Sequence, residues 1–486
     1  MTGLQPWQQV TVGFIDPLGN PSEWINENEF RYALTDGNPV VDRTLIADGS
    51  GQVSWVRVGT NDVEGVWSVR VETEDESTFE NYLLSQLQLP DQPSETIGIQ
   101  MRRYRGSLSD TYYSSLVPST VAVDLQSHLG WVADRLSQDQ GVQSLRIPDI
   151  YLAGNQNLFS ELAAATGTSV GFEDGFYRSS GTRPGIYIRT DTFRTDLQAL
   201  LTHEYVHLTL NEIASGHSLP PWLNEGLAEY LEFDLGLMGE RPNATRFRLY
   251  RTADLVRQAA LDDALLKLPD LESQETWNSQ KDDDLISLQY AEAFMAISYL
   301  TETFGDKGAV GIVKSMGRGF NLPLAIEEAI QLGYPEFQTG FYRWLETWQN
   351  PEREAVRAYL ETLDEILETD AKISSRRTEE LNSELPLFQR VPAKEELLAD
   401  AHALMDRLGQ TPVPSNASSL NSEASSYLVT LVRWLALELE FTRTGVDARR
   451  IEANQMIPEI QGRAGLVRRG ITDLKVVYNL NDSRVP

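Results

Sequence analysis

Two histidines and a glutamate stand at a spacing that could hold a metal ion and activate a water molecule. The segment His203-Glu204-Tyr205-Val206-His207 has the pattern HExxH. On a helix, residues four apart lie on the same side, so both imidazoles would face one ion. The chain has no cysteine, so the ligands must be His, Asp or Glu, and imidazole nitrogens suit a tetrahedral zinc ion. Glu204 is predicted to act as general base on a zinc-bound water.

A second segment offers a third ligand for the same ion. Pro220 and Pro221 cannot continue the first helix, but they can begin another one. After the loop at 215–219 this second helix can fold back and present Glu225 to the metal. One turn later, Glu229 is predicted to accept the free N–H of a ligating imidazole. The alternative for Glu229 is a solvated glutamate or a simple helix ion pair.

The elements that must carry these residues follow from the pattern of apolar side chains. Residues 197–213 have apolar positions at helical spacing, with Asp196 as the N-cap and Gly216 as the stop. From residue 193 to 349 almost the whole chain is predicted to be helical. Upstream, helices are expected at 121–136 and 159–165. Strands are expected at 10–15, 30–34, 53–58, 66–72, 97–101, 147–153, 175–178 and 186–189.

The two metal-site segments together resemble a known family of metallopeptidases. His203-Glu204-Tyr205-Val206-His207 followed by Trp222-Leu223-Asn224-Glu225-Gly226 is similar to the gluzincins, specifically to the peptidase MA-like domains related to the aminopeptidase N family. The resemblance covers roughly residues 97–350. It implies a thermolysin-like catalytic domain, one Zn²⁺ ion, and Glu225 as the third ligand.

The same resemblance implies a role for a tyrosine further along the chain. Gln289-Tyr290-Ala291-Glu292-Ala293-Phe294 matches the helix that carries the family's catalytic tyrosine. Tyr290 is therefore predicted to stabilise the oxyanion. A core tyrosine is the alternative, and Tyr230 and His217 are the other candidates for the oxyanion role.

One departure from the family bears on the mode of cleavage. The aminopeptidases bind the free amino terminus of a substrate with a Gly-x-Met-Glu-Asn segment, and the corresponding region 180–188 has no such sequence. Cleavage within a chain is therefore the prediction. The strand at 186–189 is expected to pair with an extended substrate as an added strand.

The order of the expected elements predicts an α+β protein in three parts. Residues 1–90 are predicted to form an immunoglobulin-like β-sandwich, because short alternating strands are separated by turn clusters. A linker is expected at 89–94. Residues 97–350 are predicted to form the gluzincin domain, and residues 351–486 a helical extension or domain.

Composition limits the partners and the location. The formal net charge of −30 argues against nucleic acid and anionic membranes as partners. The longest apolar stretch, 427–441, is interrupted by charged residues, so no membrane span is predicted. The lack of cysteine favours an extracytoplasmic or cell-surface protein whose leader is absent from the present chain; a cytoplasmic location is the alternative.

The sequence thus predicts a zinc-dependent endopeptidase that acts on peptides or unfolded proteins. Two alternatives stay open. One is a catalytically silent gluzincin scaffold that serves as a binding or cell-surface protein. The other is a zinc hydrolase with a substrate other than a peptide, because fold and metal do not fix the substrate.

Overall fold

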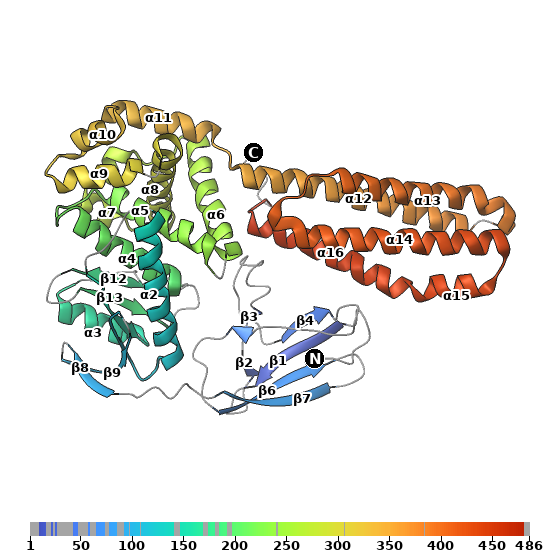
Figure 1. Ribbon diagram of the computed structural model, residues 1–486, viewed down its shortest axis with the longest axis horizontal. Helices are drawn as coiled ribbons and strands as arrows, with labels where there is room; N and C mark the ends of the chain where they lie inside the picture. The colour runs from blue at the N-terminus through green and yellow to red at the C-terminus, as the bar shows by residue number, and fades with distance from the viewer. Residues whose placement is uncertain are drawn as a thin grey trace.

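The computed structural model is mostly helical, with one mixed sheet and a small N-terminal sheet (Figure 1). Before residue 97 it describes only the strands. From residue 98 to 480 it describes all residues except 107, 140–145, 169–173, 180–183, 192–196, 240–241, 306 and 383.

The N-terminal strands form an antiparallel sheet with a buried apolar face. Strand β1 (Gln9–Ile15) pairs with β2 (Pro21–Ser22), β4 (Asp42–Ile46) and β6 (Gly65–Glu72), and β6 pairs with β7 (Ser77–Leu84). β3 (Ile25–Asn26) and β5 (Arg57–Val58) form a separate pair. Val10, Val12 and Phe14 alternate on β1 and are buried, as the period of a half-buried strand requires. The expected strand at 30–34 lies outside the described residues, and the immunoglobulin-like class stays a prediction.

A six-stranded mixed sheet supports the metal-site helices. Its order is β12-β13-β11-β10-β9-β8, and β13, β11 and β10 run parallel to one another. The strands are β8 (Gln92–Thr96), β9 (Ile99–Arg105), β10 (Asp110–Tyr113), β11 (Asp149–Ala153), β12 (Gly175–Arg178) and β13 (Gly185–Arg189).

The observed sheet differs from the expectations in three places. The linker expected at 89–94 partly forms strand β8, which tolerates Pro93 because it lies at the edge of the sheet. Strand β10 was not expected, because Asp-Thr-Tyr-Tyr shows no clear alternation. The strand at 186–189 is β13, and both of its sides are paired, with β11 and with β12. It therefore cannot accept a substrate strand; among the described strands the free edge on this side belongs to β12.

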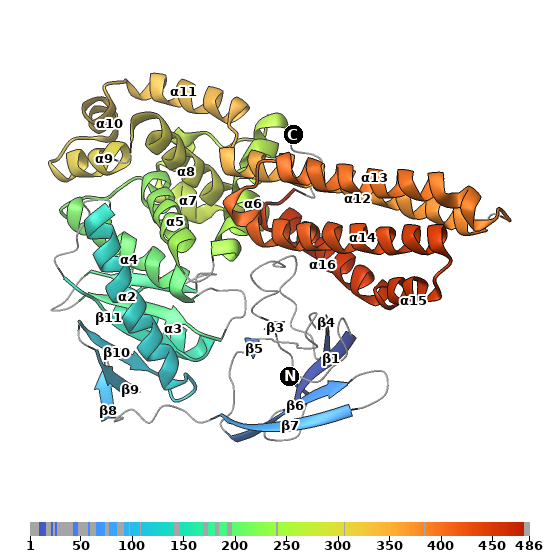
Figure 2. The same cartoon turned by 45° about the vertical axis from the view of Figure 1, so that its right-hand side comes forward.

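Helices cover both faces of the sheet. α3 (Gln156–Thr166) packs on β11 and β13, and its Phe159 contacts Phe176 of β12. α4 (Leu197–Ile213) packs on β12 and β13, and α2 (Ser119–Asp139) packs against α4, β9 and β10. Figure 2 shows α2 and α4 close together at the sheet. The sheet thus positions α4, the helix that carries the HExxH residues.

The helices that follow enclose α5 (Pro221–Met238) in one apolar core. α8 lies along α5, and buried side chains of both helices belong to a single cluster that extends from Tyr113 to Trp348. The helices that follow α5 are α6 (Pro242–Leu261), η1 (Leu268–Leu271), α7 (Gln274–Ser279), α8 (Asp283–Phe304), α9 (Lys307–Gly317), α10 (Leu322–Ile330) and α11 (Tyr334–Thr347). The prediction of an almost wholly helical segment from 193 to 349 agrees with this part of the structure.

The C-terminal helices run side by side as an elongated bundle with a core of its own (Figures 1 and 2). They are α12 (Pro351–Asn382), α13 (Leu387–Gln410), η2 (Ser415–Ala417), α14 (Ser418–Thr444), α15 (Asp447–Gln455) and α16 (Ile457–Val477). Within the described part of the chain, no helix has the length and apolar character that crossing a membrane requires.

A buried ion pair anchors the bundle on α6. Two nitrogens of the Arg353 guanidinium donate to the two carboxylate oxygens of Asp254, each over 2.6 Å, and Nε donates to the carbonyl oxygen of Tyr478 over 2.9 Å. The ring of Tyr478 stacks on Tyr250 of α6 with centroids 5.3 Å apart. A bidentate pair with its donors satisfied is the form in which buried charges are tolerated. The start of α12 and the end of α16 are therefore fixed to the same helix.

Candidate metal centre

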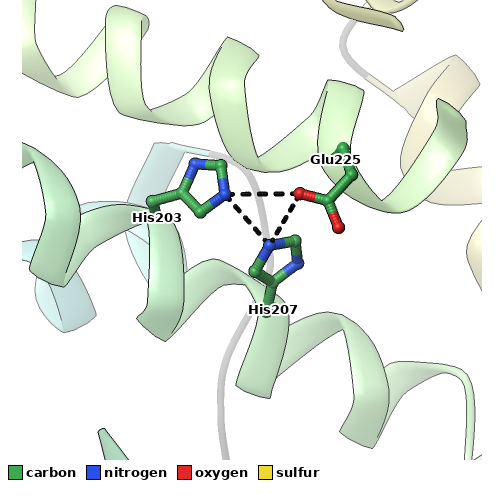
Figure 3. A group of neighbouring side chains, drawn as sticks. All are labelled: His203, His207 and Glu225. Atoms are coloured by element: carbon green, nitrogen blue, oxygen red, sulfur yellow. Dashed lines mark hydrogen bonds and ion pairs between the residues drawn. The ribbon is translucent and has the colours of Figure 1, made fainter. Parts of the chain in front are cut away.

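Three side chains from α4 and α5 converge on one point (Figure 3). Nε2 of His203 lies 3.0 Å from Nε2 of His207, and Oε2 of Glu225 lies 3.2 Å from the His207 nitrogen and 3.5 Å from the His203 nitrogen. Ligand atoms about 2.0–2.1 Å from a tetrahedral zinc ion lie about 3.3 Å from one another. The triangle therefore has the size that one zinc ion at its centre requires.

Local sequence explains how the two helices reach this arrangement. α4 ends at Ile213, and α5 begins at Pro221, the position where a proline is favoured in a helix. Both bounds agree with the expectation from sequence, whereas the expected N-cap Asp196 lies outside the described residues. Next to the carboxylate ligand candidate, Gly226 allows α8 to approach: a Cβ atom there would lie 2.4 Å from the carbonyl oxygen of Ala293. Any larger residue would push these helices apart.

The free nitrogen of His203 has a carboxylate partner, but a different one from the residue expected. Nδ1 of His203 lies 3.2 Å from Oε2 of Glu232, and Arg248 of α6 donates to Oε1 of the same carboxylate over 2.5 Å. Glu232 thus accepts the hydrogen bond that Glu229 was expected to accept, although Glu229 lies in the same cluster as His203 and Glu232.

The surroundings of the two glutamates shift their pKa values in opposite directions. Burial, followed by the charge of Glu232, raises the pKa of Glu229, so this carboxyl tends to keep its proton. Burial acts in the same direction on Glu232, but Arg248 and His203 outweigh it and lower its pKa. Glu232 is therefore the charged acceptor that an imidazole N–H favours.

The centre favours a bound cation. Burial by itself raises the pKa of Glu225, yet His207 and His203 hold it well below its ordinary value. Burial lowers the pKa of His203, but hydrogen bonds to Glu225 and Glu232 raise it well above its ordinary value. The charged carboxylates of Glu225 and Glu232, one at each nitrogen of the His203 ring, thus favour positive charge at this point.

Strand β12 forms the wall of the centre beside α4. Residues 175 and 177 face α4 because side chains alternate along a strand. A Cβ atom on Gly175 would lie 3.1 Å from Oε1 of the buried Glu204, and the ring of Tyr177 stacks on His207 with centroids 5.6 Å apart and planes at 23°. Burial, followed by the charges of Glu204 and Glu225, raises the pKa of Tyr177 to about 12. Glu204 and Tyr177 therefore lie where β12 packs on α4, next to the metal centre.

Tyr290 lies on α8, three residues before Ala293, the residue whose carbonyl faces Gly226. Its ring meets Trp277 of α7 edge to face, with centroids 5.1 Å apart, and Gln289 donates to the Trp277 carbonyl oxygen over 3.4 Å. α7 thus contacts α8 at Gln289 and Tyr290. Of the other oxyanion candidates, Tyr230 stacks on Phe294 and His217 is exposed in the loop between α4 and α5.

Comparisons with known proteins add little to this geometry. No protein-family model matches the sequence, and no curated protein matches it. Among solved structures, native LTA4 hydrolase from yeast is similar over 79% of this chain and 66% of that one, with a TM-score of 0.32 and 10% sequence identity.

Three residues of the centre were missed by sequence reasoning. Glu232 stands seven residues after Glu225, two helical turns along the same face, and this spacing is a signal that could have identified it. Arg248 and Tyr177 reach the centre from other elements. No local pattern relates them to the HExxH segment.

Proposed function

We propose that this protein is a zinc-dependent metallopeptidase of the gluzincin type that cuts within peptide chains. The triangle formed by His203, His207 and Glu225 supports this proposal most strongly, because its donors and its size suit one zinc ion. The buried Glu204 next to the first imidazole supports hydrolysis rather than metal storage.

The residues fit zinc chemically. Two imidazoles and one carboxylate are a ligand set of catalytic zinc sites, which keep a fourth position open. When bound, zinc polarises the scissile carbonyl and lowers the pKa of water. Glu204 takes the proton of the attacking water and returns it to the leaving amine. Tyr290 donates a hydrogen bond to the oxyanion of the substrate.

The free edge of β12 is the proposed site for the substrate backbone. An extended peptide adds to an exposed strand edge through main-chain hydrogen bonds. Gly175 and Tyr177 place this strand beside Glu204 and His207, so a peptide on the edge would pass the metal centre. Any extended segment of a peptide fits such an edge, and the region 180–188 lacks the family's segment for a free amino terminus. Both features favour internal cleavage.

A mixed peptide library tests the proposed function. Peptides with acetylated amino termini and amidated carboxyl termini, and the same peptides with free amino termini, are incubated with the zinc-loaded protein, and the products are identified by mass spectrometry. Internal cleavage that stops with a chelator and returns with zinc is expected. Cleavage of peptides with free amino termini alone would indicate an aminopeptidase. No cleavage at full zinc occupancy would favour the silent scaffold or a zinc hydrolase with another substrate.

Tyr290→Phe is expected to lower kcat about 100- to 1,000-fold, the cost of removing one oxyanion donor, with little change in KM. The hydroxyl is proposed to act on the charge that develops during the reaction, so the loss falls on turnover. Steady-state kinetics on one cleaved peptide measures both constants. Tyr230→Phe is the matched comparison, since Tyr230 is another oxyanion candidate and lies on α5 against Phe294 of α8. An unaffected rate in the first variant and a loss in the second would move the oxyanion role to Tyr230.

A further inference from the structure

The two histidines of the metal centre are held in different ways. His203 has the Glu232 carboxylate 3.2 Å from its Nδ1 atom. Nδ1 of His207 is buried, and no acceptor for it exists within the part of the chain that the structure describes. Histidines that bind metals almost always donate their second N–H to an acceptor, which fixes the ring. His207 therefore needs another constraint to keep its Nε2 atom on the metal.

Tyr177 offers that constraint. Its ring covers the His207 imidazole at 5.6 Å between centroids with planes only 23° apart, an offset-stacked arrangement. The edge of the same imidazole faces His203, whose ring lies almost perpendicular to it at 82°. The ring of His207 is thus bounded by Tyr177 on one face and by His203 at its metal-binding edge (Figure 3 shows the two histidines).

The strand that carries Tyr177 is held by the sheet. β12 pairs with β13 along its whole length, and on its other face Phe176 stacks on Tyr187 at 4.5 Å and contacts Phe159. These contacts anchor β12 from the face opposite the metal centre. Tyr177 is therefore fixed by the sheet and not by the helix that carries its partner.

We infer that Tyr177 is the positioning residue of His207: its stacked ring holds the second zinc ligand in place, as Glu232 holds the first. This inference rests on the proposed zinc site. It assigns the effect to the aromatic ring and not to the hydroxyl group. It also makes the free-edge strand β12 part of the metal centre.

Zinc affinity of variants, measured by competition with a chromogenic chelator, tests the inference. Tyr177→Leu and Tyr177→Met remove the stacked ring and are expected to weaken zinc binding about 10- to 100-fold, the usual cost of losing the support of a ligand. Tyr177→Phe keeps the ring and is expected to bind zinc as tightly as the wild type. The visible spectrum of the cobalt(II)-loaded protein is expected to change in the Leu and Met variants and not in the Phe variant.

Phe176→Leu is the matched control. It removes a ring that is stacked more closely, at 4.5 Å on Tyr187, from the same strand but on the opposite face, so it weakens packing without touching His207. Its zinc affinity is expected to stay near the wild-type value, because the pairing of all four β12 residues with β13 keeps the strand, and with it Tyr177, in place. An equal loss in Phe176→Leu and Tyr177→Leu would overturn the inference, because strand stability would then explain both. Should the Leu variant not fold, the Met variant carries the same comparison.

The remaining outcomes separate this inference from the proposed function. If the wild type binds zinc tightly and all Tyr177 variants match it, only the positioning role is wrong. A loss in Tyr177→Phe as large as that in Tyr177→Leu would also overturn it, since the hydroxyl would then carry the effect. If the wild type itself binds no zinc, the proposed zinc peptidase fails.

Discussion

Glu204→Gln is expected to abolish most turnover while the protein keeps one zinc ion per chain. Glutamine has nearly the same shape as glutamate but cannot take a proton from water. General bases contribute about 100- to 10,000-fold to the rate, so a loss of this size in kcat is expected. Glu204 is buried beside Gly175 and is not one of the three residues that form the triangle. Metal binding is therefore expected to persist.

Glu212→Gln is the matched control for this variant. Glu212 lies on the same helix, but it pairs with Arg146 at 2.9 Å, away from the triangle. Its turnover is expected to equal that of the wild type. Unchanged turnover in Glu204→Gln would assign the proton transfer to another group. Loss of zinc in this variant would show that Glu204 supports the metal instead.

His203→Ala is expected to lose the metal ion and, with it, all turnover. The substitution removes one corner of the triangle and leaves the Glu232 carboxylate, which Arg248 still holds, without its imidazole partner. The fall in zinc affinity is expected to exceed the about 10- to 100-fold cost that is typical of changes outside the ligands themselves. Metal analysis of the purified protein, together with chelator competition, measures this loss.

His402→Ala is the corresponding control, because His402 is an exposed histidine on α13 of the C-terminal bundle. It is expected to keep the zinc content of the wild type. Full zinc occupancy in His203→Ala would contradict the ligand assignment. Equal loss in both variants would point to non-specific binding by histidines.

Local patterns were enough to predict the elements that carry the candidate site. The bounds of α4 and the start of α5 at Pro221 could be read from apolar spacing and from two prolines. The spacing of His203 and His207 on one helix face follows from helix geometry alone. Glu225 needed the resemblance to gluzincins as well, because its approach depends on how α5 packs against α4.

Contacts between distant segments could not be predicted in this way. Strand β10 is short and lacks alternation, and the position of β12 at the edge follows from pairing across the sheet rather than from its own four residues. Arg248 pairs with Glu232 and lowers the pKa of that carboxyl, and it lies on another helix, α6. The predicted location, the three-domain division and the substrate stay predictions.

The most direct measurement is a crystal structure of the zinc-loaded protein with diffraction data collected on both sides of the zinc absorption edge. One anomalous peak is expected, about 2.0–2.1 Å from Nε2 of His203, Nε2 of His207 and a carboxylate oxygen of Glu225. A peak held by other residues, or no peak within the triangle at full zinc content, would contradict the proposed metal centre.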